Sequence, residues 1–200
     1  MYLVSSPTSP FVRKVRVLLH ETGLGDRVSE TPVATTPFAT APDVAAANPL
    51  GKIPALLRED GPALHDSRVI CRYLDAQAGA GLYPEARLWE VLTLESIADG
   101  MMEAGVLMVY EERLRPEAAR HAPWVEAQWA KIARALDALE ERWISHLAGP
   151  LDMAQIAVAC ALGYIDFRHD ARGWRKGHPA LAAWFDAFAT RDSMQRTMPA

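Results

Sequence analysis

Apolar residues in the second half of the chain recur every three or four positions, the spacing of one helix face. One amphipathic stretch covers residues 88–112 and closes near Pro116. The next apolar positions are Val125, Trp129, Ile132, Leu136, Leu139, Trp143 and Leu147. Two further helices are predicted at residues 153–166 and 179–190. From residue 84 onward the pattern therefore predicts helices alone.

The first 77 residues change character more often and predict a mixed α/β unit. Short apolar segments predict strands at residues 2–4, 28–33, 53–57 and 63–64. Helical spacing marks residues 11–21 and 67–75, and the loop at 37–47 leaves room for one short helix. We therefore predict a first domain at 1–77, a glycine-containing linker at 78–86 and an all-helical domain at 87–200.

The amino-acid composition argues against several classes of function. Half of the 200 residues are hydrophobic, and the formal net charge is −4, which favours a globular fold without a nucleic-acid surface. Two distant cysteines and six histidines without ligand spacing predict no disulfide framework and no metal site. The sequence has no 20-residue apolar run and no secretory signal pattern, so we expect no membrane span and a cytoplasmic location.

Ser9 and Pro10 stand between a predicted strand and a predicted helix. Pro10 suits the first helical position, which makes Ser9 the N-cap, and capping alone is the commoner role of such a serine. The same place also favours negative charge, because backbone N–H groups and the helix dipole point there. A thiolate held there would have a lowered pKa, and the Ser9 hydroxyl would donate a hydrogen bond to it.

Two more clusters suit a small ligand. Pro54 opens an apolar strand, and a cis bond there would turn the backbone of Ile53 toward an extended peptide, although most prolines are trans. Asp66 and Ser67 stand at another strand-to-helix junction, where one of them is expected to be a cap. Free N–H groups at that junction would receive a carboxylate, and Asp66 would face an ammonium group. Together the clusters describe a short peptide thiol as the ligand.

In this order, these residues resemble the glutathione S-transferase superfamily. Residues 9–15 are similar to the serine-type motif of bacterial and plant tau-like members. Residues 48–56 match its "NPxGKxPxL" segment, and residues 66–68 match its γ-glutamyl motif. Residues 151–157 fall where the family has a capping box, here with Asp152 and Gln155. The resemblance implies a thioredoxin-like N-terminal domain followed by an all-helical C-terminal domain.

The resemblance also implies roles for single residues. Ser9 would polarise the glutathione thiol, and its being serine rather than cysteine favours conjugation or reduction over a mixed disulfide. Ile53 would bind the cysteinyl backbone beside a cis Pro54, and Asp66 with Ser67 would hold the γ-glutamyl group. Lys52 would reach the glycine carboxylate, although a solvated surface role suits it equally, and Phe11 would pack under the sulfur, although a plain core role is commoner. Asp99 would lie near the glutathione of a partner subunit, as similar acidic residues do in related bacterial members.

The acceptor pocket is expected on the first long C-terminal helix. Methionine suits adaptable apolar pockets, but an ordinary core position is its commoner role. Trp174 would either roof the pocket or anchor the C-terminal helices. The residues expected to line it are Met102, Gly105, Tyr110 and Trp174.

The resemblance thus predicts a homodimeric glutathione transferase whose glutathione thiolate attacks a small hydrophobic electrophile. Two alternatives stay open on the sequence. One is a non-catalytic glutathione- or ligand-binding protein of the same fold, since a fold does not fix a function. The other is a glutathione-dependent isomerase or dehalogenase, which only substrate assays would separate from the transferase.

Overall fold

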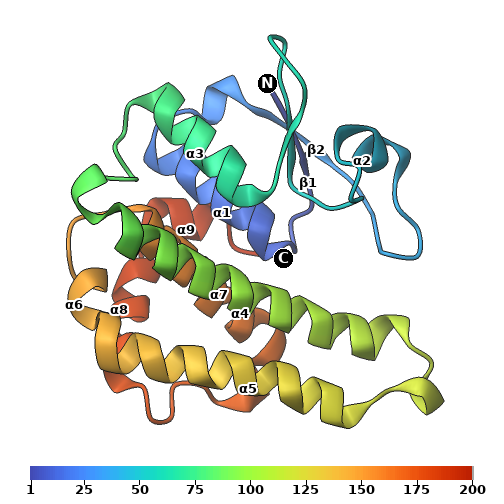
Figure 1. The fold of residues 1–200 in the computed structure, drawn as a ribbon, viewed down its shortest axis with the longest axis vertical. Coiled ribbons are helices and arrows are strands. Elements are labelled where there is room, and N and C mark those ends of the chain that lie inside the picture. The colour runs from blue at the N-terminus through green and yellow to red at the C-terminus, as the bar shows by residue number, and fades with distance from the viewer. Residues whose placement is uncertain (200) are drawn as a thin grey trace. The chain divides into compact units, whose positions relative to one another are not determined.

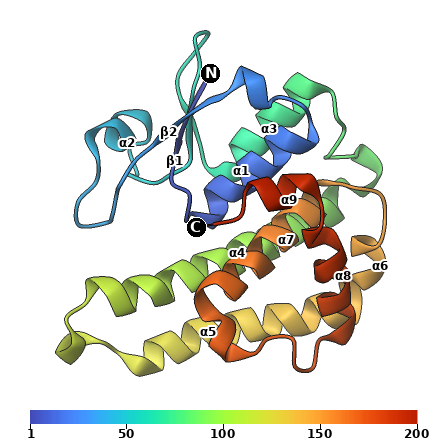
Figure 2. The same ribbon diagram turned by 180° about the vertical axis from the view of Figure 1, so that it is seen from behind.

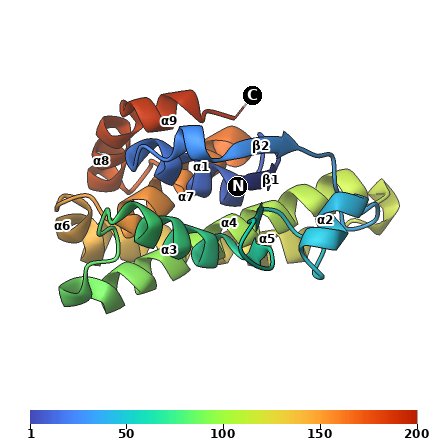
Figure 3. The ribbon, with the colours of Figure 1, turned by 90° about the horizontal axis from the view of Figure 1, so that it is seen from above.

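The computed structural model describes residues 1–199, and their backbone forms two units. The first unit contains Met1–Arg87 together with residues 191–199, and the second contains Leu88–Thr190. Within residues 1–199, no helix combines the length and apolar character needed to cross a membrane. Figures 1–3 give three views of the chain, and each unit is described here by itself.

A four-stranded sheet of order β2-β1-β3-β4 is the centre of the first unit. β1 pairs parallel with β2 and antiparallel with β3, and β3 pairs antiparallel with β4. Leu3 and Val4 are both buried because β1 is an interior strand with a covered face on each side. The strands are β1 (Tyr2–Ser5), β2 (Ser29–Pro32), β3 (Ala55–Leu57) and β4 (Leu64–His65).

Three helices cover this sheet: α1 (Pro10–Glu21), α2 (Pro42–Ala47) and α3 (Ser67–Ala78). Figure 1 shows α1 and α3 on one side of the strands and α2 on the other. The α1 face with spacings of three and four is buried at Val12, Val15 and Leu18, as the sequence pattern predicted. α3 continues three residues beyond the predicted end at residue 75, because Gly79 supplies the left-handed C-cap (φ 61°).

The last part of the chain packs against α1. Residues 191–199 contain a short helix, α9 (Asp192–Arg196), which lies beside α1 in Figures 2 and 3. Arg13, which is nearly buried, donates to the carbonyl of Met194 at 3.0 Å. Glu21 accepts two hydrogen bonds from Arg191, at 2.8 and 2.7 Å. The hydrophobic pattern did not predict α9, since five residues carry too little periodicity to recognise.

The second unit is entirely helical. α4 packs against both α5 and α7, and Figure 1 shows these three long helices side by side. Between α5 and α6, residues Leu139–Trp143 form a wider π-type turn, where the sequence has two successive apolar steps of four. The helices are α4 (Leu88–Leu114), α5 (Ala122–Ala138), α6 (Ile144–Leu147), α7 (Met153–His169) and α8 (Pro179–Ala189).

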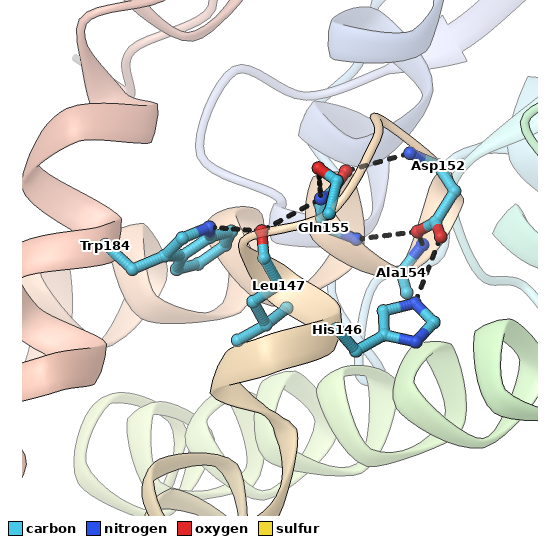
Figure 4. A network of polar contacts seen from close by, with 7 residues as sticks. His146, Leu147, Asp152, Ala154, Gln155 and Trp184 are labelled. Carbon is cyan, nitrogen blue, oxygen red and sulfur yellow. Dashed lines mark hydrogen bonds and ion pairs between the residues drawn. The ribbon is translucent and has the colours of Figure 1, made fainter.

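α7 is the buried centre of the helical unit, and its first turn carries the predicted capping box. Asp152 accepts from the amides of Ala154 and Gln155, while Gln155 Oε1 accepts from the amide of Asp152 at 2.8 Å. Gln155 Nε2 also donates to the carbonyl of Leu147, and Figure 4 shows this network. The backbone N–H groups of Ala154 and Gln155 are therefore both paired, which allows this helix end to be buried.

Candidate functional site

Ser9 is the N-cap of α1. Its backbone is extended (φ −81°, ψ 123°), and its hydroxyl oxygen accepts from the amide of Val12 at 3.3 Å. A hydroxyl can accept and donate at the same time, so the Ser9 proton remains available to a further group. The hydroxyl stands at the positive end of a 12-residue helix, where a thiolate would be stabilised. The predicted cap is confirmed.

Three other hydroxyls precede Ser9, one at the end of β1 and two in the loop before α1. Ser5 is buried and donates to Glu30 Oε2 at 3.2 Å. Ser6 and Thr8 lie 3.5 Å apart, oxygen to oxygen. Ser9 is therefore the residue of this loop whose hydroxyl stands at the helix N-terminus, which agrees with its selection from the motif.

The Ile53–Pro54 peptide bond is cis, as the resemblance implied. Pro54 precedes β3 instead of opening it, since the strand begins at Ala55. Within residues 1–199, neither the N–H nor the C=O of Ile53 forms a hydrogen bond. A main-chain donor and acceptor are thus free beside a sheet, which is the arrangement that pairs with an extended peptide.

Asn48 holds the segment before Ile53 in place. This residue lies in the sequence motif, but the sequence provided no reason to assign it a role. Its buried amide donates to the carbonyl of Lys52 at 2.8 Å and accepts from the amide of Leu50 at 2.9 Å. Gly51 has a positive φ of 63°, and a Cβ there would lie 3.0 Å from the Thr40 methyl group. The turn before Ile53 is therefore closed by one amide side chain and one glycine.

Lys52 and Phe11 flank these groups. The Lys52 side chain is exposed, beside the Ile53 backbone that carries the free donor and acceptor. Phe11 is half-buried on the first turn of α1, two residues after Ser9. Both positions are compatible with the predicted glutathione contacts, which remain predictions.

Asp66 is the N-cap of α3 and has a positive φ of 68°, unusual for a residue other than glycine. Its Oδ1 accepts from the amide of Arg68 at 2.9 Å, and the Arg68 guanidinium binds both carboxylate oxygens. The Arg68 side-chain hydrogen bond, with help from its charge and from nearby Lys14, holds the pKa of Asp66 below its usual value against the opposing effect of desolvation. A backbone held in such a region often marks a binding site.

Ser67 follows as the first residue of α3, and it is buried. Among residues 1–199 its N–H and its hydroxyl have no hydrogen-bond partner. These donors stand at a helix N-terminus beside an ionised carboxylate. The junction is compatible with the predicted binding of an amino-acid carboxylate and ammonium, which remains a prediction.

The other predicted residues lie in the helical unit. Asp99, Met102, Gly105 and Tyr110 are on α4, with Met102 buried and Tyr110 half-buried. Gly105 lies against α7, because a Cβ there would be 3.1 Å from Tyr164 Cε1. Trp174 is buried in the same unit.

Trp174 makes the contacts of an anchor. Its indole N–H donates to Asp166 at 2.6 Å, its ring packs near Phe185, and Arg175 lies 4.6 Å from its ring centroid. These contacts match the second of the two roles considered for it.

Sequence reasoning missed Tyr164 and His169 on α7. His169 Nε2 lies 3.0 Å from the carbonyl oxygen of Gly105, and desolvation by burial lowers the pKa of His169. Tyr164 is buried, and this burial raises its pKa to about 12. Neither residue belongs to a recognisable sequence motif. Their surroundings are created by the packing of α7 on α4.

Comparisons with known proteins agree with this geometry. Residues 8–77 match the family model for the glutathione S-transferase N-terminal domain, and residues 122–187 match the one for the C-terminal domain. The chain is 37% identical to the GST-like protein YibF of Escherichia coli (strain K12) over 204 residues, covering 100% of this chain and 98% of that protein. It is 31% identical to glutathione S-transferase 3 of Zea mays, covering 99% and 93%.

Solved structures give the same result. A glutathione transferase family member from Pseudomonas fluorescens, solved with bound glutathione, has a TM-score of 0.97 at 48% identity, covering 100% of this chain and 98% of that one. A glutathione S-transferase from Methylobacillus flagellatus, also with glutathione bound, has a TM-score of 0.85 at 35% identity, covering 100% and 99%. The four-stranded sheet unit and the helical unit are those of the predicted fold class. The chain belongs to the glutathione S-transferase superfamily.

Proposed function

We propose that this chain is a glutathione transferase, which binds glutathione, ionises its thiol and transfers the sulfur to a small hydrophobic electrophile. The observation that carries the proposal is the hydrogen bond from the Val12 amide to Ser9 Oγ at 3.3 Å. It holds the hydroxyl at the N-terminus of α1 and leaves the hydroxyl proton free to donate. A sulfur in front of that hydroxyl is better stabilised as thiolate than as thiol.

The binding groups complete the proposal. The free N–H and C=O of Ile53 would pair with the cysteinyl backbone of glutathione. The first turn of α3 would receive the γ-glutamyl carboxylate through the Ser67 donors, while Asp66 would bind the γ-glutamyl ammonium. Each of these contacts fixes the orientation of the thiol toward Ser9, and a positioned nucleophile reacts faster because less entropy is lost in the transition state.

Relatives support the same ligand. The Pseudomonas fluorescens family member was also solved with bound S-(propanoic acid)-glutathione, at 47% identity and a TM-score of 0.92. In that molecule the glutathione sulfur carries an organic acid. A chain this similar supports glutathione binding here, and the sulfur-linked group favours transfer to an electrophile over binding alone.

The test is to titrate glutathione into the purified protein and to follow the ultraviolet absorbance of its thiolate against pH. We expect thiolate formation well below the pKa of free glutathione. Ser9→Ala should bind glutathione but shift the thiolate titration up by about one pH unit or more, since a charge-assisted hydrogen bond of about 1.5 kcal/mol is lost. Ser6→Ala is the matched control, because its hydroxyl pairs with Thr8 in the same loop.

Each outcome decides between functions. Glutathione binding without thiolate formation would contradict the transferase and favour the non-catalytic binding protein. Halide release without a lasting conjugate, or isomerised product, would identify the dehalogenase or the isomerase. The homodimer is also part of the proposal and rests on family membership, and sedimentation equilibrium of the full chain would test it.

A further inference from the structure

Arg13 ties the first turn of α1 to the C-terminal segment, residues 191–199, which belongs to the same unit. Its Nη2 donates to the carbonyl oxygen of Met194 at 3.0 Å, and its Nε donates to Oγ1 of Thr197 at 3.5 Å. Arg13 is only 8% exposed and Thr197 is fully buried, so water has little access to either contact. Breaking these contacts would leave buried guanidinium donors without acceptors, which is costly.

The carbonyl that Arg13 binds lies toward the C-terminal end of α9, where helix carbonyls lack a backbone partner. In a continuing helix the amide of Met198 would bond to Met194, but it donates to the carbonyl of Gln195 instead, at 3.3 Å. Arg13 supplies the donor for the Met194 carbonyl, and a cation suits the C-terminal end of a helix. Each side of this contact therefore satisfies the other.

The turn of α1 that carries Arg13 also holds Ser9. The Arg13 amide donates to the Ser9 carbonyl at 3.0 Å, and the Val12 amide donates to Ser9 Oγ at 3.3 Å. Helix ends open more easily than helix centres, so a first turn without further contacts spends part of its time unwound. The Arg13 side chain fastens this turn to a second element. The position of the Ser9 hydroxyl thus depends on residues from the end of the chain.

The other end of α1 is fastened to the same segment and provides an internal comparison. Glu21, the last residue of α1, accepts from Arg191 at 2.8 and 2.7 Å and from the Ser193 hydroxyl. Glu21 lies about three turns from Ser9 along the helix. This contact can stabilise the unit without holding the first turn. The two fastenings therefore have different expected effects on a sulfur bound at Ser9.

Resting on the proposed function, we propose that Arg13 is a positioning residue for the glutathione thiol, with the C-terminal segment as its anchor. Arg13 keeps the first turn of α1 wound, and the wound turn keeps the Ser9 hydroxyl where it donates to the sulfur. Loss of the Arg13 contacts would lower the fraction of time for which this hydrogen bond to the thiolate is formed. Arg13 acts through Ser9, and other groups bind the peptide part of glutathione.

The test is the thiolate titration of glutathione bound to the full chain, which needs no acceptor substrate. In Arg13→Gln the titration should move up by about half a pH unit, because the Ser9 hydroxyl is held in place for less of the time. The Kd for glutathione, measured at a pH where the thiol is protonated, should change less than about twofold. Arg13→Lys should give a smaller shift, since lysine keeps the charge without the planar fork, and it serves if Arg13→Gln does not fold.

Glu21→Gln is the matched control, because it weakens the fastening at the other end of the same helix. It should lower the free energy of unfolding and leave the thiolate titration unchanged. Ser9→Ala combined with Arg13→Gln tests whether Arg13 acts through Ser9. The double variant should titrate like Ser9→Ala alone, since no hydroxyl is left to position.

Three results of these titrations would overturn the inference. An unchanged titration in Arg13→Gln would leave Arg13 a purely structural role. Equal shifts in Arg13→Gln and Glu21→Gln would show a general loosening of α1 instead of positioning. A further shift on the Ser9→Ala background would show that Arg13 acts on the sulfur independently of Ser9.

Amide hydrogen exchange separates this inference from the proposed function, because it is measured without glutathione. The amides of Val12 and of residue 13, both bonded to Ser9, should exchange about tenfold faster in Arg13→Gln than in the wild type. The Thr22 amide, bonded to Leu18 at 2.9 Å at the other end of α1, should keep its rate.

These rates distinguish the two possible failures. If the wild type forms no thiolate but the rates change as expected, the proposed function fails, and the fastening of Ser9 by Arg13 is supported. If the wild type forms thiolate but the rates at Val12 and residue 13 stay unchanged, the proposed function stands and the positioning role of Arg13 is overturned.

Discussion

His146 Nε2 lies 3.0 Å from Oδ2 of Asp152, and this contact joins the end of α6 to the N-cap of α7 (Figure 4). The other oxygen of Asp152 accepts from the first turn of α7, so both sides of a fully buried carboxylate are paired. The start of the central helix is thereby tied to the preceding helix by side chains as well as by the connecting loop.

Asp152→Ala is expected to destabilise the protein by about 3 kcal/mol, from the lost cap and the unpaired buried donors. Asp152→Asn should lose less, because asparagine also caps. Urea unfolding followed by circular dichroism measures both. Asp192→Ala, which removes an exposed carboxylate from the short α9, should change the free energy of unfolding by less than about 0.5 kcal/mol. A similar loss in the two alanine variants would contradict the role of the network.

Gly105 and Gly100 offer a matched pair on α4. A Cβ at Gly105 would meet Tyr164 at 3.1 Å and His169 at 3.4 Å, whereas one at Gly100 would meet nothing within 4 Å. Gly100→Ala should stabilise the protein by about 0.5–1 kcal/mol through helix propensity. Gly105→Ala should instead destabilise it by about 1 kcal/mol, since overpacking outweighs that gain. Thermal unfolding measures both, and stabilisation by both substitutions would show that the α4–α7 contact is loose.

Asp66→Asn separates the charge of Asp66 from its capping role, because asparagine caps helices and tolerates a positive φ. If Asp66 binds the γ-glutamyl ammonium, the KM for glutathione should rise by roughly tenfold, with kcat at saturating glutathione nearly unchanged. Asp60→Asn, in the turn before β4, removes a nearby exposed carboxylate and should change neither. A fall in kcat without a change in KM would contradict the assignment.

Glu21 should make the stability of the first unit depend on acid pH. The Arg191 hydrogen bonds, aided by Ser193, lower its pKa from the usual 4.5 against the effect of desolvation. The stabilisation is therefore fully present above pH 4.5, and it is lost as the pH falls through the lowered folded-state pKa. Glu21→Gln should be less stable near neutral pH and should lose less on acidification. Urea midpoints between neutral and acid pH measure this, with Glu59→Gln, an exposed carboxylate, as the control. Parallel pH profiles for wild type and Glu21→Gln would argue against the pair.

Much of the candidate site could be predicted from residues close together in the sequence. Ser9 before Pro10 and Asp152 before Gln155 are capping signals, because the bonds that they make close within one helical turn. Asp66 could be recognised as a cap for the same reason, although its positive φ had no signal in the residue type. The cis bond at Pro54 came from the family motif, since a proline alone favours the trans form.

Segment boundaries were predicted less well. The strand expected from Ile53 begins at Ala55. This residue pairs with Val4 of β1, and the register between β1 and β3 ends at that pair. Helix α9 was missed because five residues hold no full hydrophobic period, and its position depends on contacts such as that of Arg13 with Met194. In both cases the partner is distant in sequence, so a local pattern carries no record of it.

Local patterns in the sequence specify the long helices, the residues at which most of them begin, and the residues of the glutathione motifs. These properties depend on hydrogen bonds and apolar spacing within a few residues. The strand order, the free backbone groups of Ile53 and the packing of Tyr164 against Gly105 depend on the tertiary structure. Burial and charge at those places come from segments far apart in the chain, and packing brings them together.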